Sequence, residues 1–112
     1  MNPTLKDLRA KKACKEGYKF YKESNCDPKE LVQDHADWYL WLAVNCSGDW
    51  INADTLKQCA LKCPWEALMH ASASLDAETL KHCAIKYPEE ALRYASALLD
   101  ADTLRECREL SN

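Results

Sequence analysis

Glycine is scarce in this chain: only two of its 112 residues are glycine. The sequence therefore has no glycine-rich loop that could cradle a phosphate group and no GxSxG nucleophile elbow, and it also lacks the HExxH motif of zinc peptidases. So little glycine beside an apolar fraction of 47% also argues against a disordered chain. We therefore expect a folded protein that is not an enzyme and has no catalytic residues.

Long apolar runs are missing as well. No stretch approaches the roughly 20 apolar residues that a membrane-spanning helix needs, and the first ten residues, MNPTLKDLRA, contain no apolar core of a signal peptide. These absences predict a cytoplasmic protein with no membrane partner. The seven cysteines agree with this, because an odd number of free thiols is typical of a reducing compartment.

A dense stripe of one charge is the third feature that the sequence lacks. Residues 1–30 carry eight basic and five acidic side chains (+3), and residues 31–112 carry seven basic and thirteen acidic ones (−6), which sum to a net charge of −3. Neither part has the clustered Lys and Arg of a nucleic-acid-binding surface. Direct binding of DNA or RNA is therefore not expected.

What the sequence does have is a repeat of 24 residues. Residues 54–77 and residues 78–101 are identical at 16 of 24 aligned positions, and a third copy begins at Asp102. A fixed period of this size indicates stacked supersecondary units. Each copy carries apolar side chains at helical spacing, and a proline (Pro64 or Pro88) then begins a second helix.

These patterns predict an all-α fold in a single domain over residues 1–112. Residues 1–50 form a helical N-terminal cap, and residues 51–112 form a short stack of 24-residue helix-turn-helix repeats. Within the cap, Gly17 disfavours a helix interior and predicts a break between the first two helices. A further helix is expected over residues 28–36, before an apolar helix from Asp37 onward.

The cysteine spacing is the feature most suggestive of chemistry. Cys59, Cys83 and Cys107 are separated by one repeat each, and packing is the favoured interpretation because a buried free thiol behaves as a small apolar group. Cys59 and Cys63 lie one helical turn apart and could supply two metal ligands, but no second pair has such spacing. No metal or other cofactor is therefore expected.

The positions at which the repeats differ supply the candidate partner-binding residues. Trp65 and Met69 stand where the next copy has Glu89 and Arg93. An exposed Trp–Met pair is typical of an interface hot spot, whereas the alternative is that both side chains pack against the N-terminal helices. The complete candidate set adds further variable and aromatic positions: Trp65, Met69, His70, Arg93, Tyr94, Tyr18 and Tyr21.

Three motifs carry a resemblance to known proteins. Residues 13–20 fit the pattern ACxEGxxF, residues 37–42 fit DWxLWL, and residues 59–72 and 83–96 fit CAxKxPxEALxxAS. This combination resembles small helical-repeat proteins of phages, prophages and toxin–immunity loci. A glycine that usually precedes the Asp-Trp pair is Ala36 here. The matching residues are mostly of the core type, so the resemblance transfers no functional residue.

The resemblance and the absent catalytic motifs together predict a non-enzymatic protein-binding module from a mobile element. Its expected partner is a host protein or ribonucleoprotein defence complex, which it would inhibit by blocking a surface, as an anti-CRISPR or other anti-defence protein does. The alternative is an immunity protein that neutralises a cognate toxin. A thiol- or metal-binding protein is a less favoured third interpretation.

Overall fold

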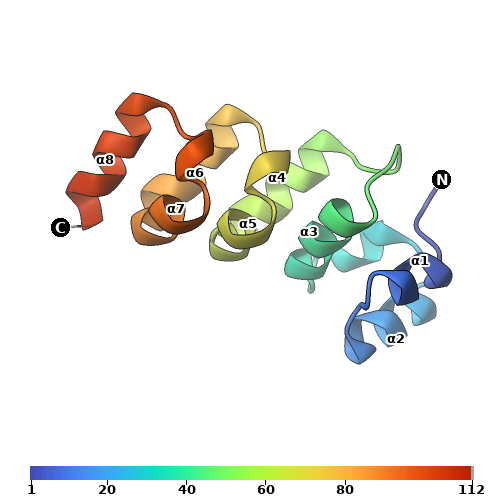
Figure 1. Ribbon diagram of the computed structural model, residues 1–112. Helices are drawn as coiled ribbons and strands as arrows, with labels where there is room; N and C mark the ends of the chain where they lie inside the picture. The colour runs from blue at the N-terminus through green and yellow to red at the C-terminus, as the bar shows by residue number, and fades with distance from the viewer. Residues whose placement is uncertain (112) are drawn as a thin grey trace.

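The computed structural model describes residues 1–111 and is built of short helices joined by tight turns (Figure 1). No strand occurs within this range, so the predicted all-α class is confirmed. Single 3-10 turns are formed by Pro28–Leu31, Ser72–Ser74 and Ser96–Leu98. The α-helices are α1 (Leu5–Ala10), α2 (Lys15–Glu23), α3 (Ala36–Asn45), α4 (Ala53–Lys62), α5 (Pro64–His70), α6 (Ala77–Lys86), α7 (Pro88–Tyr94) and α8 (Ala101–Ser111).

From α3 onward the chain runs back and forth between two rows of helices (Figure 1). One row holds α3, α5 and α7, and the other holds α4, α6 and α8; each helix packs against the next helix of its own row and against its chain neighbour in the other row. The helices α1 and α2 pack together at the N-terminal end of the rows (Figure 1). The result is an elongated body of 45 × 23 × 22 Å.

The same capping contact begins each helix of the second row. The side-chain oxygens of Asn52, Asp76 and Asp100 accept a hydrogen bond from the backbone N–H three residues later, at 3.0, 2.7 and 2.7 Å. These contacts satisfy one of the N–H groups that a helix start leaves without a partner. They fix where α4, α6 and α8 begin, 24 residues apart.

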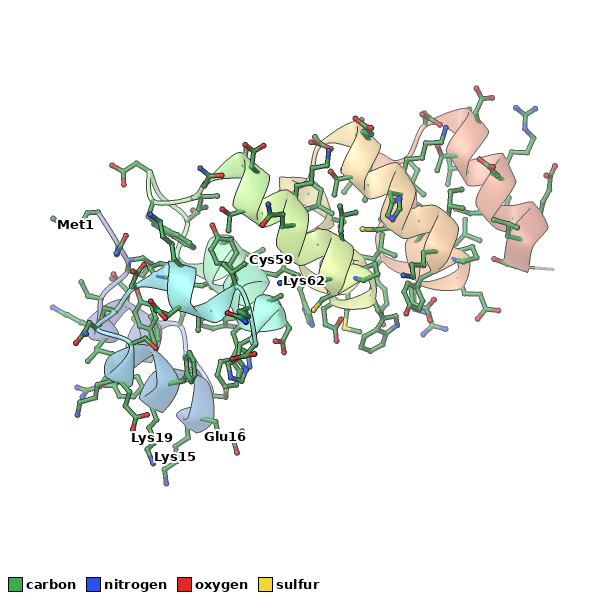
Figure 2. All side chains as sticks on the ribbon, turned by 180° about the vertical axis from the view of Figure 1, so that it is seen from behind. Met1, Lys15, Glu16, Lys19, Cys59 and Lys62 are labelled. Carbon is green, nitrogen blue, oxygen red and sulfur yellow. The ribbon has the colours of Figure 1, made fainter. Side chains whose placement is uncertain are left out.

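Small side chains lie where neighbouring helices of the second row pack closely. Cys59, Cys83 and Cys107 are fully buried, as are Ala60 and Ala84. In Figure 2, Cys59 lies on α4 within the body of the molecule rather than on its rim. Packing therefore accounts for this column of cysteines, as expected for a small thiol between closely spaced helices.

Two details of the cap differ from the prediction. Gly17 lies inside α2, and the break before that helix comes from Lys12, whose φ is 59°. Residues 28–36 do not form one helix, because only Pro28–Leu31 make a 3-10 turn before the chain bends at His35. The predicted helix is interrupted at His35, whose backbone (φ −135°, ψ 52°) is not helical and whose ring stacks on Trp38 at the start of α3.

Candidate protein-binding surface

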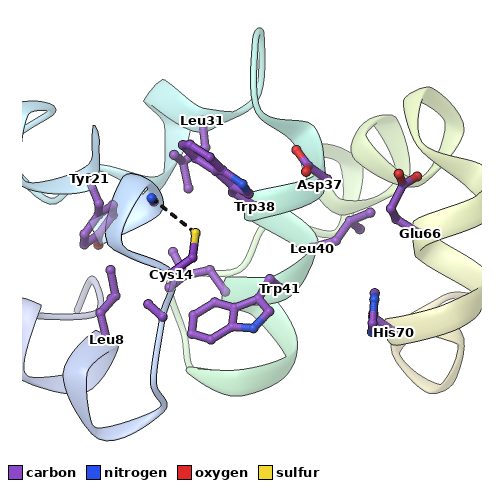
Figure 3. Close-up of a pocket in the computed structure, with 13 residues that line it drawn as sticks. Leu8, Cys14, Tyr21, Leu31, Asp37, Trp38, Leu40, Trp41, Glu66 and His70 are labelled. Atoms are coloured by element: carbon purple, nitrogen blue, oxygen red, sulfur yellow. Dashed lines mark hydrogen bonds between the residues drawn. The ribbon is translucent and has the colours of Figure 1, made fainter. Parts of the chain in front are cut away.

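A cleft of about 270 Å³ lies between the N-terminal cap and α5, and we call it the cap cleft (Figure 3). This volume is below the roughly 300–1,000 Å³ of typical small-molecule sites. It therefore suits one inserted side chain better than a cofactor. Most of its lining is apolar, and the largest apolar members are Leu8, Leu31, Trp38, Leu40, Trp41 and Leu42.

The two indoles in the cap cleft come from one face of α3. Trp38 and Trp41 are three residues apart, so successive helical turns place them on the same side. The imidazole of His35 stacks on Trp38 with ring centroids 3.9 Å apart, and the ring of Phe20 meets that imidazole edge-on at 4.6 Å. This aromatic cluster fixes the orientation of the Trp38 indole before any partner arrives.

Gly17 keeps the α2 side of the cap cleft open. A Cβ atom at this position would lie 3.1 Å from Cys14 Sγ and 3.8 Å from the Trp38 indole. The same sulfur accepts a hydrogen bond from the Gly17 N–H at 3.3 Å and so caps α2 (Figure 3). Glycine here leaves room for both the sulfur cap and the indole.

Polar groups gather on the α5 side of the cap cleft. Figure 3 shows the carboxylates of Asp37 and Glu66 and the imidazole of His70 at this side. Burial raises the pKa of the nearby Cys63 thiol, and the negative charges of Glu66 and Asp37 raise it further. Both carboxylates therefore act on the same small region, and among residues 1–111 neither one forms a salt bridge.

The opposite flank of α5 carries the Trp–Met pair. Glu66 and His70 line the cap cleft beside α3. At 3.6 residues per turn, Trp65 and Met69 project from the other side of the buried face of α5. They therefore point towards α7, which is the neighbour of α5 on that side of the row.

Tyr94 completes a second apolar area between α5 and α7. It occupies the repeat position of His70, so it faces α5 in the way that His70 faces α3. Trp65 is 40% exposed and Tyr94 is 42% exposed, while Met69 is half-buried. We call Trp65, Met69 and Tyr94 the α5–α7 patch.

The remaining repeat candidate is near this patch. Arg93 is exposed, and its guanidinium carbon lies 5.9 Å from the centre of the Tyr94 ring. This distance is typical of a cation–π contact, which holds the tyrosine ring at the surface. The structure thus places Trp65, Met69, Arg93 and Tyr94 on neighbouring helices and His70 at the cap cleft.

Tyr21, predicted as a partner-binding residue, forms part of the inner lining of the cap cleft and offers almost no exposed surface of its own. Only 1% of it is exposed, because its hydroxyl approaches the carbonyls of Pro3 at 2.7 Å and Cys26 at 2.9 Å inside the cap. Tyr18 is half-buried, and its hydroxyl accepts a hydrogen bond from Arg9 at 2.9 Å. Lys15 and Lys19, by contrast, project from α2 into solvent (Figure 2).

The cap cleft itself was missed from the sequence. The apolar helix expected from Asp37 onward contains Trp38 and Trp41, but the sequence predicts no cleft beside them. A signal was present in the DWxLW spacing, which puts an acid and two indoles close together on α3. Glu66 gave no signal, because the next repeat has an identical glutamate, Glu90.

The thiol and metal interpretation finds no assembled site in residues 1–111. No three His, Cys, Asp or Glu side chains within this range come together in an arrangement that could hold a metal ion. Cys59 is fully buried, and burial raises its thiol pKa to about 11. Such a thiol is a poor nucleophile at neutral pH.

Comparison with known proteins identifies no relative of this chain. No family model, no curated protein and no solved structure matches the chain. None of the helices in residues 1–111 combines the length and the apolar character needed to cross a bilayer. The function must therefore be argued from the surface itself.

Proposed function

We propose that this chain is a non-enzymatic protein-binding module that uses the row of α3, α5 and α7. The observation that carries the proposal is Trp65, a large aromatic side chain that is 40% exposed on α5 although the equivalent residue of the next repeat is Glu89. Interface hot spots are enriched in Trp and Tyr. Tyr94 and Met69 beside it give the patch the aromatic and adaptable character of a binding surface.

Charge indicates which partner fits this row. Residues 31–112, which contain both rows, carry thirteen acidic and seven basic side chains, a balance of −6. Asp37 and Glu66 add local negative charge at the cap cleft. Complementary charge speeds association and selects partners, so the partner is a protein with a basic surface.

The motif resemblance supplies the biological setting of the proposal. Proteins of phages, prophages and toxin–immunity loci act against or protect host systems, and a chain of this kind inhibits a bacterial defence complex, such as a CRISPR effector, in the cytoplasm. A surface blocker needs no chemistry of its own, because it only has to favour one state of its target. Nucleic-acid-binding complexes expose basic grooves, which the acidic rows complement.

The test is affinity capture with tagged protein from a bacterial lysate that contains active defence systems. We expect a defence-complex subunit in stoichiometric amount on the wild-type protein. The double variant Trp65→Glu/Met69→Arg, which copies the next repeat, should lose it. The matched control is Glu89→Gln, which changes the equivalent position of α7 and should retain the subunit.

Three outcomes oppose the proposal in different ways. Retention of the subunit by the double variant would remove the α5–α7 patch from the interface. Stoichiometric recovery of a toxin would replace inhibition by immunity. A bait that captures no partner in any lysate, together with hydrolase or transferase activity in purified protein, would remove the binding-module class.

A further inference from the structure

The cap cleft carries an inference that deepens the proposed function and rests on it: it names the group that the partner inserts. We propose that the cap cleft receives the guanidinium side chain of an arginine on the partner protein. The cleft combines apolar walls with two carboxylates, and each part excludes a different class of occupant.

The walls select a long side chain with a flat end. Trp41 and Trp38 contribute indole rings, one face of Trp38 being covered by the His35 imidazole. The leucines Leu8 and Leu40 line the remaining wall. An aliphatic stem gains stability by burying its methylene groups against such surfaces. A volume of about 270 Å³ admits one such side chain and leaves no room for a helix or a cofactor.

The carboxylates select a cation. Asp37 and Glu66 reach the cleft from different helices, α3 and α5, and among residues 1–111 neither is engaged in a salt bridge. The negative charges of both carboxylates raise the pKa of the Cys63 thiol, so both act on the same region. Of the lining residues only His70 is basic. Lys62 also acts on the Cys63 thiol and lowers its pKa, but its ammonium donates to the Val32 carbonyl at 3.2 Å and, among residues 1–111, forms no salt bridge with either carboxylate.

Arginine fits this combination better than lysine. Its guanidinium is planar, stacks on aromatic faces and is more weakly hydrated than an ammonium group, so it enters an apolar cleft at lower cost. It also offers several N–H donors to carboxylates in fork geometry. Indole is the aromatic ring that attracts cations most strongly, and the cap cleft has two indoles.

The test uses the full chain and a small probe, blocked arginine (N-acetyl-arginine methylamide), in a nuclear magnetic resonance titration. The chain has four tryptophans, and the indole N–H signal of each one is followed separately. We expect saturable shifts of Trp38 and Trp41 with a dissociation constant on the order of 1 mM. Trp50, whose indole donates to the Cys46 carbonyl at 2.7 Å, and Trp65 are internal references that should not move.

Matched probes and variants separate recognition of the positive charge from nonspecific apolar binding. Blocked citrulline, the neutral isostere, should bind at least about tenfold more weakly, and blocked lysine should fall between the two. Asp37→Asn/Glu66→Gln should weaken arginine binding about tenfold or more. Glu90→Gln, at the same repeat position as Glu66 but on α7, should leave binding unchanged.

The inference is overturned if citrulline binds as well as arginine, if the double variant binds as the wild type does, or if the probe moves Trp65 instead. Since no protein partner is needed, this result is independent of the capture experiment. A captured partner with no arginine binding would overturn the cap-cleft inference and leave the proposed function standing. If arginine binds but the Trp65→Glu/Met69→Arg variant still captures the partner, the cap-cleft inference stands and the α5–α7 patch is removed from the interface.

Discussion

The thiol of Cys83 donates a hydrogen bond to the backbone carbonyl of Ala60 in the neighbouring helix, with 3.7 Å between Sγ and O. One repeat further along, Cys107 makes the same contact with Ala84 at 3.6 Å. The contact links α4 to α6 and α6 to α8. Cysteine suits this position because it is small, buries well and still offers a weak donor to a carbonyl.

Burial makes these thiols inert in the folded state. It raises the pKa of Cys59 and of Cys83 to about 11, and the thiolate is the reactive form. We expect that at pH 8 a maleimide labels the exposed Cys14 within minutes while Cys83 and Cys107 stay unmodified for hours. Peptide mapping by mass spectrometry measures this. Labelling of all seven cysteines in guanidinium chloride is the control, and native labelling of Cys83 at the rate of Cys14 would contradict the packing.

Tyr21 should stabilise the cap through its hydroxyl. Tyr21→Phe leaves the carbonyls of Pro3 and Cys26 without this donor, so we expect a loss of about 1–2 kcal/mol in the free energy of unfolding. Tyr18→Phe removes only an exposed bond to Arg9 and should cost less than about 0.5 kcal/mol. Urea unfolding of both variants makes the comparison, and equal losses would show that the buried position of the hydroxyl has no effect.

The caps of the second row predict acid sensitivity. Hydrogen bonds from Thr79 hold the pKa of Asp76 below its usual value, and those from Thr103 do the same for Asp100. A carboxyl whose pKa is lower in the folded state adds stability above its unfolded value of about 3.9, and this stability is lost as the pH falls through the folded pKa.

Asp76→Asn/Asp100→Asn tests this sensitivity, because Asn52 already caps the equivalent helix α4. The double variant should keep its melting temperature near pH 7, and this temperature should fall less than that of the wild type between pH 5 and pH 2. Thermal unfolding followed by circular dichroism across this range is the measurement. An unchanged acid dependence would assign it to other carboxylates.

The α5–α7 patch should contribute little to folding. Trp65→Glu/Met69→Arg introduces residues that the next repeat tolerates at these positions, so we expect a change below about 1 kcal/mol in the free energy of unfolding. Leu68→Ala, at a fully buried neighbour on the same helix, should cost about 2–5 kcal/mol. Similar losses for the two variants would place the Trp–Met pair in the core.

The sequence predicted those parts of the fold that depend on local patterns. Pro64 and Pro88 mark the starts of α5 and α7 because the fixed φ of proline acts within a single helical turn. The all-α class followed from helical spacing along most of the chain.

The cap and its cleft depend on contacts between distant residues, which no local pattern encodes. The Phe20 ring packs edge-on against His35, fifteen residues later, and Tyr21 is buried because Pro3, eighteen residues earlier, lies beside it. Glu66 lines the cleft although an identical glutamate at position 90 lies outside it. Its role comes from α3 as a neighbour and not from its own repeat.

In the two-row arrangement, the number of repeats sets the length of the molecule without affecting its N-terminal end. Removing residues 78–101 would join Ala77 directly to Asp102, and this junction repeats the Ala101–Asp102 junction of the intact chain. The shortened protein would keep every residue that lines the cap cleft and lose one helix from each row. Duplicating the same 24 residues would instead lengthen both rows, so gain or loss of one period changes the reach of the molecule while its N-terminal end stays the same.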